Sequence, residues 1–431
     1  MADKSTLNAD VLVTDVLIVG GGLVGGSLAA ALAGAGLRVA LVDRADPRTL
    51  IDEAHDGRAS AIALGSGRAL QGIGVWRHVG EAASPILDIR ITDADAPVFL
   101  HYDHRDLGDR DRSGRDHRDR SGATPSGQFP FGHIVENTVL RRALWTRFQE
   151  LPALTVLAPA ALETLERRPD AVEATLADGR RIRAALAVAA EGRKSRLRRE
   201  AGIGVTEWRY DQVGIVCTVR HALPHRGVAH EHFLPSGPFA SLPMTGDRSS
   251  IVWTERADLA PAALALSDDD FSAELQRRFG DWLGGVRLEG GRWSYPLGLM
   301  HAERYVDHRL ALVGDSAHVI HPIAGQGLNL GLRDVAALAE TIVDARRLGQ
   351  DIGQRHLLER YQRWRRVDNL TLIGVTDGLN RLFSTSLPPI ALARQLGLAA
   401  VQQMPGLKRL FMRHAMGLVG ELPRLVAGQA L

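Results

Sequence analysis

A glycine-rich turn near the N-terminus carries the clearest chemical signal in the sequence. It reads Gly20-x-Gly22-x-x-Gly25 and stands between a β-branched run and an Ala-rich segment, with a second apolar run after them. The first glycine permits a tight turn, the second lets backbone N–H groups approach a pyrophosphate, and the third lets a helix pack closely on a strand. Asp43 follows about 20 residues onward, where it can accept hydrogen bonds from a ribose. Residues 15–43 therefore predict a βαβ unit that binds FAD or NAD, with a ligand-free glycine turn as the alternative.

A second stretch, residues 309–334, places a carboxylate directly after another apolar run. It reads RLALVGDSAHVIHPIAGQGLNLGLRD, in which Asp315 follows the run. The stretch is similar to the Gly-Asp motif of the flavoprotein aromatic hydroxylases, and its second half resembles the UbiH/UbiF/VisC family of ubiquinone-biosynthesis hydroxylases. The resemblance implies that Asp315 accepts hydrogen bonds from the ribityl chain of FAD. A simple cap on the following turn is the structural alternative.

The glycine loop in the same stretch opens a predicted helix that runs from about Leu328 to Arg346. Its backbone N–H groups and the helix dipole can point at the N1–C2=O edge of a flavin and stabilise the anionic reduced ring. A plain tight loop is the alternative. By the resemblance, the cofactor-binding residues at this helix start are Gly325, Gln326, Gly327, Leu328 and Asn329.

Two histidines in the loop invite a metal-site interpretation that the sequence supports only weakly. His318 and His321 are three residues apart and have no third nearby ligand. We therefore predict no metal site, and a packing or hydrogen-bonding role for His318. His321 and Pro322 fall where the family places residues beside the flavin, so they are the candidate active-site lining.

Three further segments extend the resemblance over almost the whole chain. Arg58, in DGRASAIALG, matches an arginine near the flavin, and a solvated loop arginine is the alternative. Asn137, in GHIVENTVLRRALW, matches a polar residue that contacts the flavin. Glu191, in AEGRKSRLR, replaces the family's aspartate in a motif implicated in FAD and NAD(P)H handling. Its extra methylene carries the carboxylate further from the backbone, and a polar turn that ends a strand is the alternative role.

The pattern of apolar residues predicts two domains and a helical tail. Alternation between residues 212 and 293 predicts a mostly antiparallel sheet, and the charge-rich segment 101–128 predicts a flexible surface loop. The expected fold class is α/β, with a Rossmann-like FAD-binding domain, an antiparallel-sheet substrate domain and a C-terminal helical segment. The expected divisions are 1–85, 129–205 and 300–375 for the FAD-binding domain, 86–100 and 206–299 for the substrate domain, and 376–431 for the C-terminal helical segment.

Charge and cysteine content bound the cellular setting. Lys and Arg total 52 against 50 for Asp and Glu, which is too even to predict nucleic-acid binding. Cys217 is the one cysteine and is expected to be a buried thiol in a reducing compartment. The N-terminus lacks an export signal and no apolar stretch is long enough to span a membrane, so we expect a cytoplasmic protein. Two alternatives remain for the basic residues near the C-terminus. They form either a solvated helix face or a basic face that binds the inner membrane surface or a partner protein; the residues are Arg394, Lys408, Arg409 and Arg413.

The resemblance also implies an activity. In this family NAD(P)H reduces FAD, O2 forms a C4a-hydroperoxyflavin, and an electron-rich phenol takes up its distal oxygen. The expected substrate is a polyprenyl-phenol intermediate of ubiquinone biosynthesis, and other quinone-biosynthesis proteins are candidate partners. The alternatives are another flavin enzyme of the same fold, such as a prenyl reductase, or a non-catalytic scaffold of a quinone-biosynthesis complex. A halogenase is disfavoured because no tryptophan stands in a Trp-x-Trp-x-Ile-Pro signature.

Overall fold

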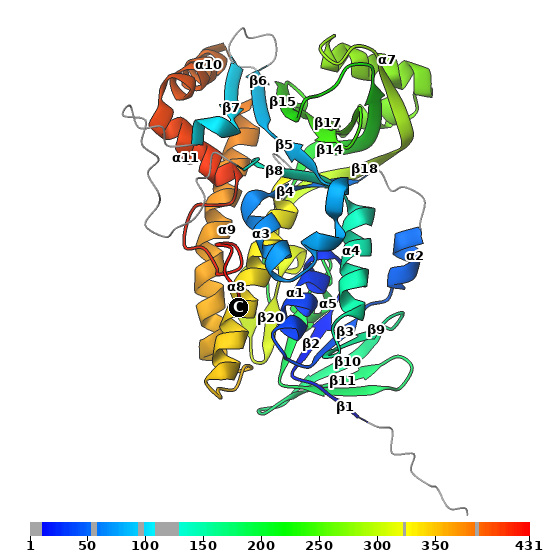
Figure 1. Ribbon diagram of the computed structural model, residues 1–431, viewed down its shortest axis with the longest axis vertical. Helices are drawn as coiled ribbons and strands as arrows, with labels where there is room; N and C mark the ends of the chain where they lie inside the picture. The colour runs from blue at the N-terminus through cyan, green and yellow to red at the C-terminus, as the bar shows by residue number, and fades with distance from the viewer. Residues whose placement is uncertain (1–10, 53–57, 94–98, 108–128, 322–324, 384–387) are drawn as a thin grey trace, which may run out of the picture.

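The computed structural model describes residues 11–52, 58–93, 99–107, 129–321, 325–383 and 388–431. The lower half of the molecule in Figure 1 corresponds to the domain expected to bind FAD, and it is called the nucleotide-binding domain below. It contains a sheet of order β19-β20-β13-β2-β3-β9, in which β19 alone runs antiparallel to its neighbour. Its strands are almost wholly apolar because both faces of a parallel sheet are covered. The strands are β2 Val16–Val19, β3 Val39–Val42, β9 Leu154–Leu157, β13 Leu186–Ala189, β19 Val306–Asp307 and β20 Leu310–Leu312.

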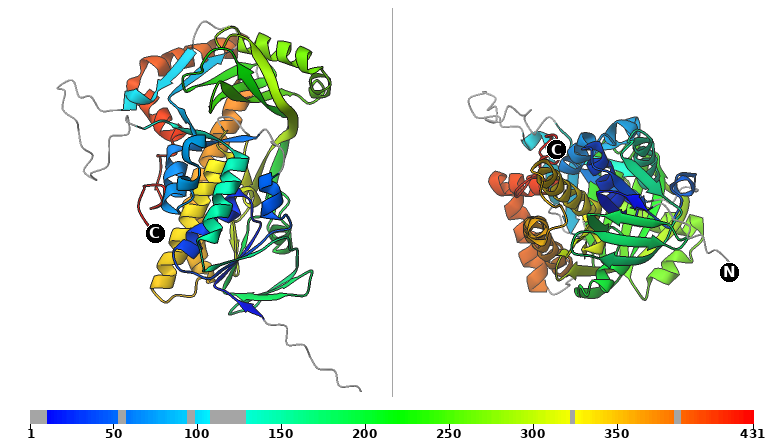
Figure 2. Two further views of the ribbon diagram at one scale, coloured as in Figure 1. Left: turned by 45° about the vertical axis from the view of Figure 1, so that its right-hand side comes forward. Right: turned by 90° about the horizontal axis from the view of Figure 1, so that it is seen from below.

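Helices and a small second sheet cover this parallel sheet and share its apolar core. The small sheet has the order β1-β12-β11-β10. Figure 2 shows the helices and the small sheet as separate layers. The helices are α1 Leu23–Gly34, α2 Pro47–Asp52, α3 Leu64–Gly72, α4 Asn137–Gln149, α5 Arg196–Glu200 and α8 Gly327–Arg347. The small sheet comprises β1 Leu12–Val13, β10 Leu162–Arg167, β11 Val172–Leu176 and β12 Arg181–Ala184.

The upper half contains a second, larger sheet of order β21-β18-β14-β17-β16-β15-β6-β7. All neighbouring pairs are antiparallel except β15 with β6. Helix α7 Asp268–Phe279 packs on the outer face, after the short helix α6 Ala260–Leu264. The strands are β6 Asp88–Asp93, β7 Phe99–Asp103, β14 Val205–His221, β15 Val228–Leu234, β16 Gly237–Met244, β17 Arg248–Arg256, β18 Val286–Ala302 and β21 His318–Val319.

A three-stranded sheet and the C-terminal helices join the two halves. The sheet has the order β4-β8-β5, and an apolar cluster connects it with the inner face of the large sheet and with helices α9 to α11. In the part of the chain that the structure describes, no helix is both long and apolar enough to cross a membrane. The elements are β4 Ala59–Ala63, β5 Ser84–Ile86, β8 Gly132–Glu136, α9 Arg355–Phe383, α10 Pro388–Gln403 and α11 Pro405–Ala415.

The structure confirms the predicted fold class, the βαβ unit and the long helix α8. Two expected boundaries are wrong. Residues 101–107 are not loop, because they complete β7 and a 3-10 turn whose apolar side chains are buried against the inner sheet face. The boundary at 375 falls inside α9, since that helix is long enough to pack on both halves of the molecule. The remainder of the expected loop, 108–128, lies outside the described residues.

The C-terminal segment also departs from an all-helical tail. After α11 the chain turns back to the nucleotide-binding domain, where Leu425 and Val426 are buried in its core. Arg394 and Lys408, which belong to the basic residues assigned to a candidate surface face, form ion pairs within the chain. Arg394 Nε lies 2.7 Å from an oxygen of the buried Asp93, and Lys408 Nζ lies 2.9 Å from Asp106.

Candidate functional site

The early glycine turn has the geometry of a phosphate-binding loop. Gly20 has φ +107°, and a methyl group there would lie 2.3 Å from the Ala190 carbonyl oxygen. A methyl group at Gly25 would lie 1.9 Å from the Gly20 oxygen, whereas one at Gly22 would meet nothing within 4 Å. The first and third glycines are thus required by close packing, and the second faces open space. Helix α1 starts there without a side-chain cap or an acidic residue, so its first N–H groups are available to an anion.

Asp43 supports this turn from the end of β3. One carboxylate oxygen accepts a 2.5 Å hydrogen bond from the N–H of Gly21, and the other accepts one of 2.7 Å from the N–H of Ala45. Each carboxylate oxygen has a second lone pair, so these bonds leave capacity for a ribose hydroxyl. Asp43 therefore fixes the turn, and its contact with ribose stays a prediction.

The late loop packs directly against the early turn. A methyl group at Gly331 in α8 would lie 2.6 Å from Val24 Cγ2, and one at Gly314 would lie 3.1 Å from the same side chain. The segment around Glu191 joins them, because the N–H of Gly192 donates to Ser316 Oγ at 3.1 Å. Stretches that are far apart in the sequence thus meet beside one phosphate-binding turn.

Asp315 lies in the 3-10 turn that follows β20, and its contact with the ribityl chain stays a prediction. Its side chain is exposed, yet the surrounding protein desolvates it and raises its pKa. A group that is both accessible and strongly desolvated is expected at the bottom of a depression. This environment, the open space at Gly22 and the uncapped N–H groups of α1 fit a dinucleotide that extends along this edge of the sheet.

Glu191 is used by the protein itself. Its Oε2 accepts hydrogen bonds from Ser195 Oγ at 2.6 Å and from the N–H of Leu197 at 3.0 Å, which ties it to the first turn of α5. The extra methylene relative to aspartate lets the carboxylate reach this turn. The Ser195 cap was a signal in the sequence, since serine is favoured before a helix. Direct contact of Glu191 with a cofactor stays a prediction.

The start of α8 offers backbone donors and is anchored by Asn329. Gly325 has φ +60°, and the helix begins without a side-chain cap or an acidic residue in its first turn. Asn329 accepts from the N–H of Ala63 at 2.9 Å and donates to the Ala61 carbonyl at 2.8 Å. Leu328 packs against the main core. Asn329 therefore locks α8 to β4, which positions the N–H groups of the helix start.

Arg58 and Asn137 lie together at the junction of β4 and α4. The N–H of Asn137 donates to the Arg58 carbonyl at 3.0 Å, and Asn137 Oδ1 accepts from Ser60 Oγ at 2.7 Å. The Arg58 guanidinium lies 5.9 Å from the ring centre of Tyr295, a residue of the large sheet. Arg58 thus lies close to the large sheet, and contact of Arg58 or Asn137 with the flavin stays a prediction.

The two loop histidines have different surroundings in the structure. His318 is buried and bonds to Asp334 Oδ2 at 2.6 Å, which confirms its predicted hydrogen-bonding role. His321 is fully buried, lies edge-on to Tyr210 at 5.1 Å, and has a pKa lowered to about 4 by burial. The described residues contain no group of three or more side chains placed to hold a metal ion. Pro322 lies outside the described residues, so its role beside the flavin stays a prediction.

A buried ion network behind the loop was missed by sequence reasoning. Asp334 accepts from the N–H of Gly314 at 3.1 Å and from Arg365 Nε at 2.9 Å, besides its bond to His318. Burial acts to raise the pKa of Asp334, but His318 and Arg365 outweigh it and lower that pKa. One signal in the sequence could have indicated this network. Asp334 is an acidic residue at a core-facing position of a long amphipathic helix, where a buried partner is expected.

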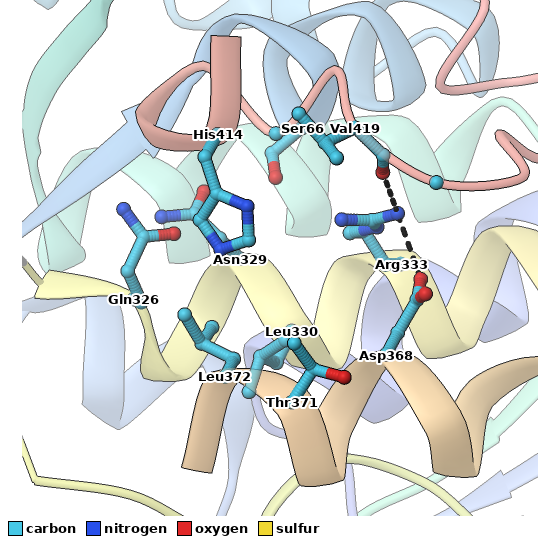
Figure 3. A pocket seen from close by; sticks show the side chains of 12 residues that line it. Ser66, Gln326, Asn329, Leu330, Arg333, Asp368, Thr371, Leu372, His414 and Val419 are labelled. Atoms are coloured by element: carbon cyan, nitrogen blue, oxygen red, sulfur yellow. Dashed lines mark hydrogen bonds and ion pairs between the residues drawn. The ribbon is translucent and has the colours of Figure 1, made fainter. Parts of the chain in front are cut away.

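A cavity of about 90 Å³ lies beside this network, between α8, α9 and the chain after α11. Figure 3 shows Arg333 in it, bonded to Asp368 Oδ2 at 2.8 Å and to the Val419 carbonyl at 3.0 Å. Gln326 and Asn329, at the start of α8, line its other side. The cavity therefore lies directly behind the turn expected to hold the flavin ring.

The parallel sheet, the glycine turn and the α8 start together define an FAD-binding flavoprotein, and comparisons with known proteins agree. Residues 13–368 match a family described as an FAD binding domain. The chain is 54% identical to ubiquinone hydroxylase UbiL of Rhodospirillum rubrum, over 94% of this chain and 90% of that protein. It is 36% identical to 3-demethoxyubiquinol 3-hydroxylase of Escherichia coli, over 90% and 95% of the two chains.

Among solved structures, p-nitrophenol 4-monooxygenase PnpA of Pseudomonas putida superimposes with a TM-score of 0.76, covering 96% of this chain and all of that one. At 19% identity this likeness shows the fold alone. The chain belongs to the UbiH/UbiF/VisC family of FAD-dependent hydroxylases, within the flavoprotein aromatic hydroxylases. FAD is its cofactor.

Proposed function

We propose that this chain is a monooxygenase that hydroxylates the aromatic ring of a polyprenyl-phenol intermediate in ubiquinone biosynthesis, with NAD(P)H and O2 as co-substrates. The observation that carries the proposal is the packing of the early glycine turn against the late loop, where Val24 contacts the Gly314 and Gly331 positions. The identity to UbiL supports the substrate class, because that relative is named a ubiquinone hydroxylase.

The residues of the chain bind and orient the reactants. The N–H groups at the start of α1 would hold the pyrophosphate, Asp315 the ribityl hydroxyls, and the N–H groups at the start of α8 the N1–C2=O edge of the flavin. When bound, FAD supplies the reductive activation of oxygen. Arg58 and Asn137 border the ring site, with His321 and Pro322 as the proposed lining. The apolar inner face of the large sheet excludes water, which protects a reactive oxygen species and favours a phenolic substrate.

The decisive experiment is turnover with a defined phenol. Purified protein loaded with FAD should oxidise NAD(P)H faster when 2-prenylphenol is added, and the product should gain one ¹⁸O atom from ¹⁸O2 by mass spectrometry. A protein that stays colourless after FAD addition would support the scaffold alternative. Saturation of the prenyl double bond without a new hydroxyl would support a prenyl reductase.

We also propose that the protein is cytoplasmic and touches the inner face of the membrane through α11. Leu410 and Phe411 are 51% and 41% exposed on this helix, and Arg409 and Arg413 are their neighbours in sequence. Exposed apolar residues beside cations favour an anionic lipid surface, where a substrate with a polyprenyl tail would reside. Other quinone-biosynthesis proteins are the alternative occupants of this surface.

Vesicle flotation distinguishes these occupants. The protein should float with vesicles that contain phosphatidylglycerol and less with pure phosphatidylcholine, and the double variant Leu410→Ser/Phe411→Ser should lose flotation. Leu348→Ser is the matched control, since Leu348 is 74% exposed at the end of α8. Equal flotation of both variants would contradict the proposal.

A further inference from the structure

Glu231 on β15 places a carboxylate on the inner face of the large sheet, among apolar neighbours. Glu231 lies in register with Ala240 on β16 and with Ile91 on β6. Its neighbours two residues away on the same face of the strand, Ala229 and Phe233, are buried in the apolar cluster between this sheet, β4 and β8, and the C-terminal helices.

The residues on either side of Glu231 point the other way. His230 stacks on Trp282, with ring centres 4.1 Å apart, on the α7 side of the sheet. His232 Nδ1 lies 2.6 Å from Thr92 Oγ1. The alternation of a strand therefore directs Glu231 away from α7 and to the side of the sheet that packs against β4, β8 and the C-terminal helices.

The same apolar cluster reaches the loop expected to hold the flavin. Ala61 on β4 packs against the cluster, and a methyl group at Gly325 would lie 3.1 Å from Ala61 Cβ. At the other end, Phe233 stacks on Phe383 of α9 with ring centres 3.8 Å apart. Glu231 thus lies on the same sheet face as an apolar cluster that extends to the flavin loop, and apolar side chains of this kind suit a prenylated ring.

The carboxylate of Glu231 is partly accessible, and no hydrogen-bond donor in the described part of the protein offsets its burial. The side chain is half-buried, and burial alone raises its pKa to about 7. Within the described chain no side-chain or backbone donor is bonded to it. The ionisable groups nearest along this face are Tyr102 on β7, whose pKa is raised by burial, and Asp93, which is already paired with Arg394. A carboxylate left without partners in an apolar wall is costly to the fold, which favours a functional role.

We propose that Glu231 binds the hydroxyl group of the phenolic substrate and accepts its proton during hydroxylation. This inference rests on the proposed function. The phenol O–H bond breaks and a Glu231 O–H bond forms, while the electron pair stays on the phenol oxygen and makes the ring carbons more nucleophilic. The hydroxylated ring carbon then loses its hydrogen as a proton to water, and the electron pair of that C–H bond restores the aromatic ring with a phenolate oxygen. Glu231 returns its proton to this oxygen.

The raised pKa makes this transfer easier than it would be to an ordinary carboxylate. A phenol has a pKa of about 10, so moving the acceptor from 4.5 to about 7 improves the transfer equilibrium by about 300-fold. At neutral pH the group is then divided between its two forms, which is the condition for an efficient general base.

The test compares Glu231→Gln and Glu231→Asp with the control Glu255→Gln. Glu255 is a buried carboxylate of the same sheet, on the face that packs against α7. With 2-prenylphenol, kcat/KM of the unchanged protein and of the control should rise with pH and level off above about 7. Glu231→Gln should be slower by about 100-fold or more and lose this pH dependence, and Glu231→Asp should recover part of both.

A second measurement is independent of turnover. Binding of 2-prenylphenol, followed by quenching of tryptophan fluorescence, should depend on pH around 7 in the unchanged protein and not in Glu231→Gln. FAD content and circular dichroism show whether each variant is folded. If the unchanged protein hydroxylates 2-prenylphenol and folded Glu231→Gln keeps its rate and pH profile, the role of Glu231 is refuted while the proposed function stands. If the unchanged protein binds the phenol with the expected pH dependence but does not hydroxylate it, the proposed function fails by itself.

Discussion

The Asp334 carboxylate accepts a 3.1 Å hydrogen bond from the backbone N–H of Gly314, and this contact joins helix α8 to the turn that carries Asp315. The same carboxylate neutralises Arg365, whose side chain is fully buried in α9. One acid therefore couples the core of the C-terminal helices to the proposed ribityl site.

Replacing this acid should weaken both stability and cofactor binding. Asp334→Ala leaves Arg365 buried without its main partner, so the free energy of unfolding should fall by about 3–5 kcal/mol. FAD affinity should fall as well because the Gly314 turn loses its anchor. Urea denaturation and FAD titration measure the two effects. Asp170→Ala, which removes a surface partner of Arg183, should cost less than about 1 kcal/mol, and equal losses in the two variants would contradict this role.

The early turn offers a pair of glycines that should separate folding from cofactor binding. Gly25→Ala forces a methyl group into the Gly20 carbonyl, so stability should fall by about 1–3 kcal/mol. Gly22 has φ −63° and open space around it, so Gly22→Ala should leave the melting temperature of the FAD-free protein unchanged. That methyl group would instead block the approach of a pyrophosphate and weaken FAD binding at least about 10-fold. Unaltered FAD affinity in Gly22→Ala would argue against the phosphate site.

Glu191 should act mainly on the stability of α5. Glu191→Ala removes two hydrogen bonds, to Ser195 and Leu197, and should lower the free energy of unfolding by about 1–3 kcal/mol. Glu191→Gln keeps an acceptor oxygen and should lose less. A loss of FAD affinity in Glu191→Gln with no change in stability would show instead that the carboxylate contacts the cofactor.

Buried histidines should make the protein sensitive to mild acid. Burial lowers the pKa of His301 and of His321 to about 4, below the ordinary 6.5. The unfolded chain then binds more protons below pH 6.5, so stability is complete above that pH and falls as the pH drops toward 4. Each histidine contributes a slope of up to about 1.4 kcal/mol per pH unit. His301→Gln should reduce the slope of unfolding free energy against pH by this amount, whereas His356→Gln, at an exposed position in α9, should not change it.

The thiol of Cys217 should be inert in the folded protein. It is fully buried on the α7 side of the large sheet, and burial raises its pKa to about 12. Iodoacetamide at pH 8 should therefore modify it only after denaturation, since the thiolate is the reactive form. Rapid labelling of the native protein, measured by intact mass, would contradict this burial.

Local signals in the sequence predicted most of the helices and strands but not the residues that they contact in the folded protein. The glycine turn and the periodicity of α8 were predictable, because backbone sterics and core burial act over a few neighbouring residues. The strand at 99–103 was missed because its charged outer positions are those of an edge strand, whose burial depends on the sheet it joins. The roles of Asn329 and Asp334 were missed for a related reason, since their partners lie in other elements far along the chain.

The sequence by itself determined where the chain must turn tightly around a dinucleotide, because only glycine fits the close backbone approaches at Gly20 and Gly25. Tertiary structure alone decided which carboxylates are engaged by the protein itself and which stay accessible. Glu191 is engaged by α5 and Asp334 by Arg365, whereas Asp315 is exposed and Glu231 is half-buried. Carboxylates differ in pKa and in partners because long-range packing surrounds each of them with different groups. No single segment of the sequence encodes that packing.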